Sequence, residues 1–306
     1  MKSDLFEWNP EGVDAWREAA PGGRRVLLQS LRGFIDAGQA GRVLTRHIRD
    51  ESTPVRVASF DIDRLLDYRS RRPEMVFSVN EWTSYDEPYL RVDMVTDAAG
   101  APFLLLHGFE PDVLWEGYIR AVKEIVDELG VTLVAGVHGI PMAVPHTRPL
   151  TATVHGTNTE LLPDSPSLFG TVTVPASATN LLEYRFGQWE RDVVNVAVHV
   201  PHYLAQSAYP QAAIRAIESL EPLTDLKLSP EALEDDAREA TDEIARQAEE
   251  SDEVQAVVAA LEEQYDSVAE AQEGVVGADG LLPTADEIGA EFEKFLADRG
   301  GDYPGA

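Results

Sequence analysis

The sequence contains no cysteine among its 306 residues. This absence excludes disulfide bonds, cysteine nucleophiles and thiolate metal sites, and it suits a reducing compartment. No apolar run approaches the roughly 18 residues that a membrane-spanning helix needs. Residues 1–10, MKSDLFEWNP, also lack the apolar centre of a signal peptide. We therefore expect a cytoplasmic protein that does not bind membranes.

Basic side chains are scarce relative to acidic ones, and the net charge is −29. Such a charge argues against nucleic acid and anionic membrane surfaces as partners, because both are polyanions. The imbalance is concentrated at one end, where residues 221–306 carry 25 acidic and 5 basic side chains and account for −20 of the total. This asymmetry predicts a discrete acidic appendage behind a more balanced body.

Apolar runs of strand length alternate with helical patterns through the first 222 residues. The runs indicate strands at 24–30, 54–60, 102–108, 131–137, 151–155, 170–175 and 193–202. Capping residues and periodicity indicate helices at 36–48, 113–129, 177–187 and 210–220. This order predicts an α/β fold, doubly wound around a mostly parallel sheet. Residues 24–60 would form a parallel strand–helix–strand unit, and 75–95 an antiparallel excursion.

These patterns divide the chain into three segments. Residues 1–24 show no regular pattern, so we expect an irregular segment with Trp8 and Trp16 as anchors onto the body. Residues 25–222 form the α/β domain. Residues 223–306 form an acidic helical extension.

The extension contains several helix boundaries. Ser229 and Pro230 mark the start of a helix that would be unusually long without a break. We expect that break near Glu250–Asp252, where Ser251 can cap a new helix. The capping box TADE at 284–287 opens a last amphipathic helix.

Six of the seven histidines stand at the C-terminal ends of predicted strands or in the adjoining loops: His107, His138, His146, His155, His199 and His202. Ligands of open α/β sheets bind outside the carboxyl ends of the strands, so these side chains are candidates for one crevice. The alternative, which we favour from sequence alone, is that each imidazole hydrogen-bonds a loop carbonyl. No H-E-x-x-H or related ligand spacing occurs, and we expect neither a metal nor a cofactor.

Several arginines are candidates for binding an anion. Arg32, Gly33 and Asp36 stand in the first strand-to-helix turn, although a plain glycine turn capped by Asp36 explains the same residues. Arg148 belongs to a proline-rich loop beside His146. Four further arginines form a patch that suits an anion or a partner: Arg64, Arg69, Arg71 and Arg72. We favour the alternative that this patch pairs with the protein's own acids, including those of the tail.

Signatures of catalysis are missing from the sequence. There is no G-x-G-x-x-G or Walker A pattern for a nucleotide, and no G-x-S-x-G elbow for a serine hydrolase. The catalytic residues, if any exist, are therefore unknown, and the balance of the sequence is against an enzyme.

Five stretches resemble the actinobacterial branch of the PAC2 family, whose superfamily includes eukaryotic proteasome assembly chaperone 2. They are LLDYRSRRP at 65–73, GIPMAVPHTRP at 139–149, HVPHYLAQSAYP at 199–210, EQYD at 263–266 and LPTADEIGAEFEKFL at 282–296. The similarity spans roughly 25–298. It implies an α/β core resembling nucleoside-phosphorylase- or hydrolase-like folds, a helical C-terminal extension and a homo-oligomer, for which it suggests a trimer.

Two features of this sequence differ from those of proteins in the superfamily and the related folds. Eukaryotic assembly chaperones dock on the proteasome ring through a C-terminal hydrophobic–Tyr–any-residue tail, whereas this sequence ends DYPGA with Tyr303 at a different position. No phosphate- or purine-binding signature of the phosphorylases is present either. We therefore expect neither ring docking by that route nor phosphorylase activity.

Two hypotheses follow for the function. The first is a non-enzymatic, homo-oligomeric PAC2-family protein that binds protein partners, with an assembly-chaperone role as one form of it. The second is a protein or enzyme that binds an anionic or nucleoside-like small molecule in the histidine-lined crevice. The sequence identifies neither the partner nor the ligand, nor the role of the acidic tail.

Overall fold

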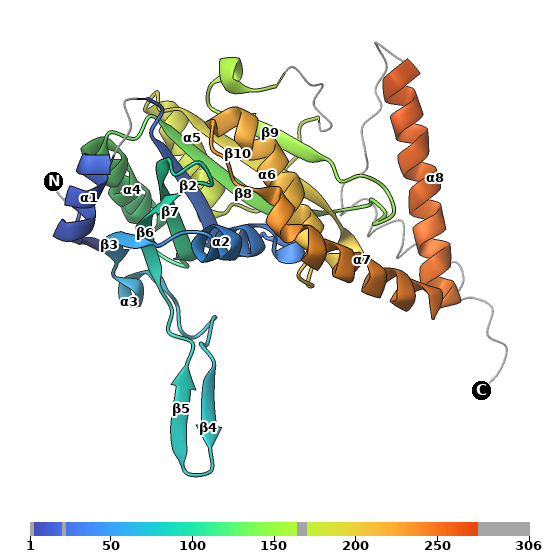
Figure 1. Ribbon diagram of the computed structural model, residues 1–306, viewed down its shortest axis with the longest axis horizontal. Helices are drawn as coiled ribbons and strands as arrows, with labels where there is room; N and C mark the ends of the chain where they lie inside the picture. Colours follow the sequence, from blue (N-terminus) through green and yellow to red (C-terminus); the bar gives the residue numbers. More distant parts are fainter. Residues whose placement is uncertain (1–2, 20–22, 164–169, 275–306) are drawn as a thin grey trace.

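The structure, a computed structural model, describes residues 3–19, 23–163 and 170–274, the last seven of these by their backbone alone. One mixed sheet of eight strands forms the centre of the body (Figure 1). Its strands lie in the order β1 (Phe6–Trp8), β3 (Val55–Phe60), β6 (Leu90–Thr96), β7 (Pro102–Phe109), β2 (Val26–Arg32), β8 (Leu133–Met142), β10 (Val193–Pro201) and β9 (Ala152–Gly156).

The α/β fold is confirmed, but the prediction of a mostly parallel sheet is wrong. Only the pairs β7–β2, β2–β8 and β8–β10 are parallel, and the other four pairs are antiparallel. Strands β2 and β3 run in the same direction, yet β6 and β7 separate them. The short link between β6 and β7, closed by the hydrogen bond from Asp97 N to Ala101 O, places these two strands side by side as an antiparallel hairpin.

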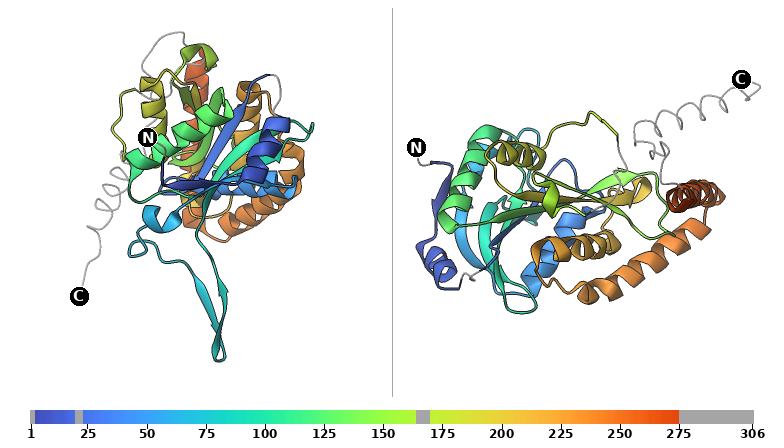
Figure 2. Two further views of the ribbon diagram at one scale, coloured as in Figure 1. Left: turned by 90° about the vertical axis from the view of Figure 1, so that its left-hand side faces the viewer. Right: turned by 90° about the horizontal axis from the view of Figure 1, so that it is seen from above.

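Helices cover both faces of the sheet, as the doubly wound prediction requires (Figure 2). One face packs against α1 (Pro10–Ala19), α4 (Trp115–Leu129) and α5 (Ala178–Gln188). The opposite face packs against α2 (Ala40–Asp50) and α6 (Pro210–Thr224). Leu27 belongs to the first apolar cluster and Leu28 to the second, because successive side chains of a strand point to opposite faces. We call these the α4 face and the α2 face.

Short elements complete the body. They are α3 (Ile62–Leu65) and the 3-10 turns at Ala37–Gln39, Thr159–Leu161, His202–Leu204 and Pro230–Leu233. No helix in the described part of the chain is both long and apolar enough to cross a membrane.

Two local expectations from the sequence are corrected. The segment 1–24 contains β1 and α1, and the indole of Trp16 is buried and donates to Leu129 O at 3.0 Å. Residues 170–175, expected as a strand, pair with no strand of the described part of the chain and are all exposed. Their alternating pattern resembles a strand, but a strand also needs a neighbouring strand that completes its hydrogen bonds, and the described residues supply none.

A second, two-stranded sheet projects from the body (Figures 1 and 2). It consists of β4 (Met75–Ser78) and β5 (Glu81–Tyr85), which pair antiparallel, and every residue of both strands is exposed. We call it the β4–β5 hairpin. It corresponds to part of the expected antiparallel excursion.

The described part of the acidic extension contains two α-helices. α7 (Glu234–Glu249) packs along α6, and α8 (Asp252–Gly274) then turns away from it (Figure 1). The break falls where the sequence predicts it, and Ser251 Oγ accepts a hydrogen bond from Val254 N at 3.4 Å. The expected helix at 284–296 lies outside the described residues, and the division into three segments stays a prediction.

Candidate functional site

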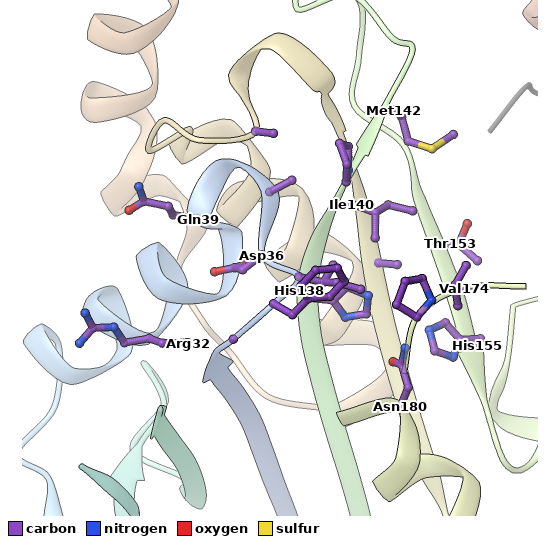
Figure 3. A pocket seen from close by; sticks show the side chains of 18 of the residues that line it. Arg32, Asp36, Gln39, His138, Ile140, Met142, Thr153, His155, Val174 and Asn180 are labelled. Atoms are coloured by element: carbon purple, nitrogen blue, oxygen red, sulfur yellow. The ribbon is translucent and has the colours of Figure 1, made fainter. Parts of the chain in front are cut away.

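An open crevice of about 1440 Å³ lies at the carboxyl ends of β2 and β8, between the turn that leads into α2 and the start of α5. Its sides come from the turn after β2, the last half of β8, strand β9, the start of α5 and residues 170–175 (Figure 3). Of the residues that the sequence predicts for a site, six line it: Arg32, Gly33, Asp36, Arg71, His138 and His155. A crevice at strand ends is what both the histidine and the anion hypotheses require.

Strand register brings His138 and His155 together. Ala197 of β10 pairs with His138 on one side and with Thr153 on the other, so these side chains share one face. The imidazole centroids of His138 and His155 are 6.5 Å apart. Because β9 runs antiparallel to β10, the C-terminal end of β9 returns toward the middle of β8. His155 therefore lies in the crevice because β9 is antiparallel to β10, and not because all strands end at the same edge, as the prediction of a parallel sheet assumed.

Glu183 of α5 orients His155. Its two carboxylate oxygens lie 3.0 and 2.9 Å from His155 Nδ1, and it also accepts a hydrogen bond from Asn195 Nδ2. Burial alone would raise the pKa of Glu183, but the hydrogen bonds from His155 and Asn195 outweigh it and hold that pKa below its usual value. With Nδ1 engaged by a carboxylate, Nε2 of His155 is the nitrogen left for a ligand.

His138 is held in its neutral form. Burial lowers its pKa to about 4, and the neighbouring His155 acts in the same direction, while Glu183 opposes both. Its Nδ1 is buried without a hydrogen-bond partner among the described residues. At neutral pH this imidazole can donate or accept one hydrogen bond but carries no charge.

A row of amides crosses the sheet beside these histidines. Gln29 of β2, Gly136 of β8 and Asn195 of β10 stand in register, followed by His155 of β9. Gln29 and Asn195 are both buried. Among the described residues, Gln29 Nε2, Gln29 Oε1 and Asn195 Oδ1 have no hydrogen-bond partner, whereas Asn195 Nδ2 donates to Glu183. A Cβ at Gly136 would stand 1.9 Å from Asn195 Oδ1, so only glycine leaves room for this amide. Such unpaired amides are typical of a site that holds ordered water.

The other end of the crevice is cationic. The guanidinium carbons of Arg32 and Arg71 lie 4.4 and 5.6 Å from the ring centroid of Phe109. Arg71 also pairs with Asp112 at 2.7 Å, whereas Arg32 lies 3.7 Å from the nearest oxygen of Asp86. Arg32 therefore has only a loose carboxylate partner at this end of the crevice.

Asp36 caps the helix that follows it. Its carboxylate accepts hydrogen bonds from the amides of Gly41, Arg42 and Gly139 at 2.9, 3.1 and 3.2 Å. Burial raises the pKa of Asp36, although these amides oppose the shift. Gly33 leaves space for the Glu110 carboxylate, which a Cβ would meet at 1.9 Å. The alternative given by the sequence, a glycine turn capped by Asp36, therefore describes the roles of Asp36 and Gly33.

Two of the predicted histidines are buried outside the crevice. His107 pairs in register with Ser30, so its side chain points to the α2 face, where Nε2 lies 2.8 Å from Asp93 Oδ2. His199 bonds the hydroxyls of Thr151 and Thr153 at 2.8 and 2.9 Å, and burial lowers its pKa to about 4. His107 is absent from the crevice because alternate positions of a strand present opposite faces. His199 shares the face of His138, but its ring is engaged by Thr151 and Thr153 and does not line the crevice.

The remaining candidates have other neighbours. His146 Nδ1 lies 2.8 Å from Tyr203 Oη, and His202 is exposed beside the same tyrosine. Arg148 binds both carboxylate oxygens of Asp266 on α8, at 2.8 and 2.7 Å, and Glu262 at 3.1 Å. These three residues do not line the crevice.

The four arginines of the predicted patch also differ in their partners. Arg64 pairs with Asp4 at 3.2 Å and Arg71 with Asp112, so these two pair with acids of the body and not of the tail. No ion pair of Arg69 or Arg72 occurs within the described residues.

Sequence reasoning missed the residues that connect the site. Asn195 was visible as one of two polar residues, with His199, in the apolar run VVNVAVHV at 193–200, which is a usable signal. Glu183 gave none, because it is one of many acids and its partner lies on a distant strand. The described residues contain no group of three or more side chains that could hold a metal ion.

This combination of fold and site defines an α/β protein with an open crevice lined by histidines and arginines. The PAC2 family model matches residues 30–248, so the chain belongs to the PAC2 family, as its motifs indicate. A search of curated proteins finds no match.

Solved structures agree with this assignment. A Mycobacterium tuberculosis protein of unknown function is 43% identical over 89% of this chain and 92% of its own, with a TM-score of 0.83. A Corynebacterium glutamicum protein of unknown function is 40% identical over 87% of this chain and 98% of its own, with a TM-score of 0.80. A proteasome-assembly chaperone homologue of M. tuberculosis shares the fold at 20% identity, over 76% and 99% of the two chains, with a TM-score of 0.69.

Proposed function

We propose that this PAC2 protein is a homo-oligomer that acts by binding protein partners. The β4–β5 hairpin is the observation that carries the proposal. Its apolar residues are exposed: Met75, Val76, Phe77, Val79, Trp82 and Tyr85, with Val79 95% and Trp82 63% accessible. An isolated two-stranded hairpin is at best marginally stable in water, and such patches mark interaction sites.

The composition of the hairpin supports an interface. Phe77 and Trp82 stack edge to face with centroids 5.1 Å apart, which prearranges an aromatic surface. Aromatic residues and methionine are enriched at protein interfaces, and truncating a central tryptophan often removes much of the binding energy. A second copy of the chain is the first occupant that we propose for this hairpin, in keeping with the trimer that the family resemblance suggests.

The class of protein partner is proposed from the family. The chain shares its fold with a protein described as a proteasome-assembly chaperone homologue, which supports a partner related to the proteasome. The acidic extension supplies a further surface on which a basic partner segment could bind.

Analytical ultracentrifugation tests the oligomer. We expect the wild-type protein to sediment as an oligomer and Trp82→Asp to sediment as a monomer with an unchanged circular dichroism spectrum. Val254→Asp changes an exposed valine of α8 and should leave the oligomer intact. A monomeric wild-type protein, or an intact Trp82→Asp oligomer, would contradict the role of the hairpin. Crosslinking to purified proteasome core particles of the same source tests the partner separately.

Small-molecule binding is the second candidate function, and the pairing of His155 with Glu183 in the crevice favours it. A thermal-shift screen of a metabolite pool should then find a stabilising compound. The shift should vanish in His155→Ala and persist in His202→Ala, whose imidazole is exposed outside the crevice. A pool without any stabilising compound, or equal shifts in both variants, would remove this candidate.

A further inference from the structure

Residues 170–176, GTVTVPA, form one wall of the crevice and resemble a strand without a partner. All seven are exposed, and Val172 and Val174 are 48% and 60% accessible. None of their backbone N–H or C=O groups makes a hydrogen bond with the described part of the chain. Alternating threonine and valine suit a strand, and an unpaired row of backbone groups is a template for pairing with another chain.

The crevice floor has the spacing of an extended peptide. His138, Ile140 and Met142 project from alternate positions of β8 into the crevice. Alternate positions of a strand repeat every ~6.6 Å, which is also the repeat of same-side residues in an extended peptide. The crevice volume of about 1440 Å³ exceeds the ~300–1,000 Å³ of ordinary small-molecule pockets.

Charge distinguishes the two ends of the crevice. Arg32, Arg42 and Arg71 line it, in a protein whose net charge is −29. Figure 3 places Arg32 on the side opposite Val174, with His138 between them. A guanidinium binds a carboxylate through two parallel hydrogen bonds, so this end suits an acidic group of whatever occupies the crevice.

We propose that the crevice binds an extended peptide segment of a protein partner. The peptide backbone pairs with residues 170–176, its alternate apolar side chains contact Ile140 and Met142, and its carboxylate, from an acidic side chain or the C-terminus, meets Arg32 and Arg42. This is the strand-addition mode of peptide recognition. The proposal rests on the proposed function, since it names a surface by which the protein would bind a partner.

Fluorescence anisotropy of the full-length protein tests the proposal. The probe is a pool of fluorescein-labelled hexapeptides with serine at the first, third and fifth positions and glutamate at the last. Valine, leucine, isoleucine or phenylalanine occupies the second and fourth. We expect saturable binding, and a loss of about tenfold in affinity when alternate amides are N-methylated or both carboxylates are replaced by amides.

Variants locate the binding. Val172→Asp should lower the affinity for the peptide by about tenfold or more. Val113→Asp, at an exposed valine outside the crevice, should leave that affinity unchanged. Arg42→Ala should also lower the affinity for the peptide. Arg46→Ala, which changes an exposed arginine one turn further along α2, should leave that affinity unchanged. Lack of saturable binding up to millimolar protein, or equal affinities for each variant and its control, would overturn the proposal.

Other results separate this proposal from the proposed function. If metabolites stabilise the protein through His155 while no peptide of the pool binds, the peptide site is rejected and the small-molecule function stands. If the peptide does not bind but Trp82→Asp dissociates the oligomer, the peptide site fails alone and the hairpin interface remains. N-methylated peptides that bind as well as the parent would exclude strand pairing and overturn the proposal.

Discussion

At the scale of single residues, the crevice contains two histidines in different environments. His155 is oriented by a buried carboxylate and remains partly exposed, with 38% of its side chain accessible. His138 has no such partner, and burial lowers its pKa to about 4. The two rings are neighbours, so a ligand in the crevice would meet one imidazole that a carboxylate orients and another that stays neutral.

Buried neutral histidines make stability depend on pH. The pKa values of His138 and His199 are lowered to about 4, so between pH 6.5 and 4 the unfolded chain binds more protons than the folded one. Their contribution is therefore complete above about pH 6.5 and is lost as the pH falls toward 4. We expect the free energy of unfolding, measured with urea, to fall by about 1–2 kcal/mol per histidine between pH 7 and pH 5.

The variant His199→Asn isolates one of these contributions. The free energy of unfolding of this variant should change less between pH 7 and pH 5 than that of the wild type, by about 1–2 kcal/mol, whatever the absolute stability of the variant. His202→Asn changes an exposed imidazole and should keep the wild-type difference. Identical differences in all three proteins would show that His199 is not buried in its neutral form.

At the scale of elements, α8 meets the loop between β8 and β9. Arg148 binds Glu262 and Asp266, Tyr265 Oη donates to Pro149 O at 3.0 Å, and Thr147 donates to Glu262. The pKa of Arg148 is raised by the hydrogen bond to Asp266, so the guanidinium stays charged at any pH at which the protein folds. These contacts lie near the surface, where salt screens ion pairs.

Removing the arginine should therefore loosen α8 without unfolding the body. In Arg148→Ala we expect faster amide hydrogen exchange across residues 252–267 and an unchanged melting temperature, because surface ion pairs contribute little to global stability. Arg246→Ala breaks pairs with Glu243 and Glu250 inside α7 and serves as the control, with no effect on exchange in α8. Unchanged exchange in Arg148→Ala would mean that apolar contacts of α8 hold it in place.

At the scale of the whole molecule, the net charge of −29 opposes compaction. Salt screens this repulsion, so we expect the melting temperature to rise as sodium chloride is added from low concentration. The same salt should speed hydrogen exchange in α8, because it weakens the pairs of Arg148. A melting temperature that falls over this range would show that attractive ion pairs outweigh the general repulsion.

The sequence by itself determined the features that depend on near neighbours. Ser177 caps α5 through a hydrogen bond from Asn180 N at 3.1 Å, and Ser251 marks the break before α8. Runs such as Val193–Pro201 predicted buried strands, and the motifs identified the family. Caps, periodicity and motifs are readable because they involve residues only a few positions apart.

Only the tertiary structure decided the order of the strands and the composition of the crevice. Nothing within β2 or β3 shows that β6 and β7 come between them, and nothing within β9 shows that it runs antiparallel to β10. Those pairings place His107 on the α2 face and bring Glu183 to His155. Strand pairing joins residues far apart in the chain, and its free energy depends on the whole set of neighbours, so local patterns leave it open.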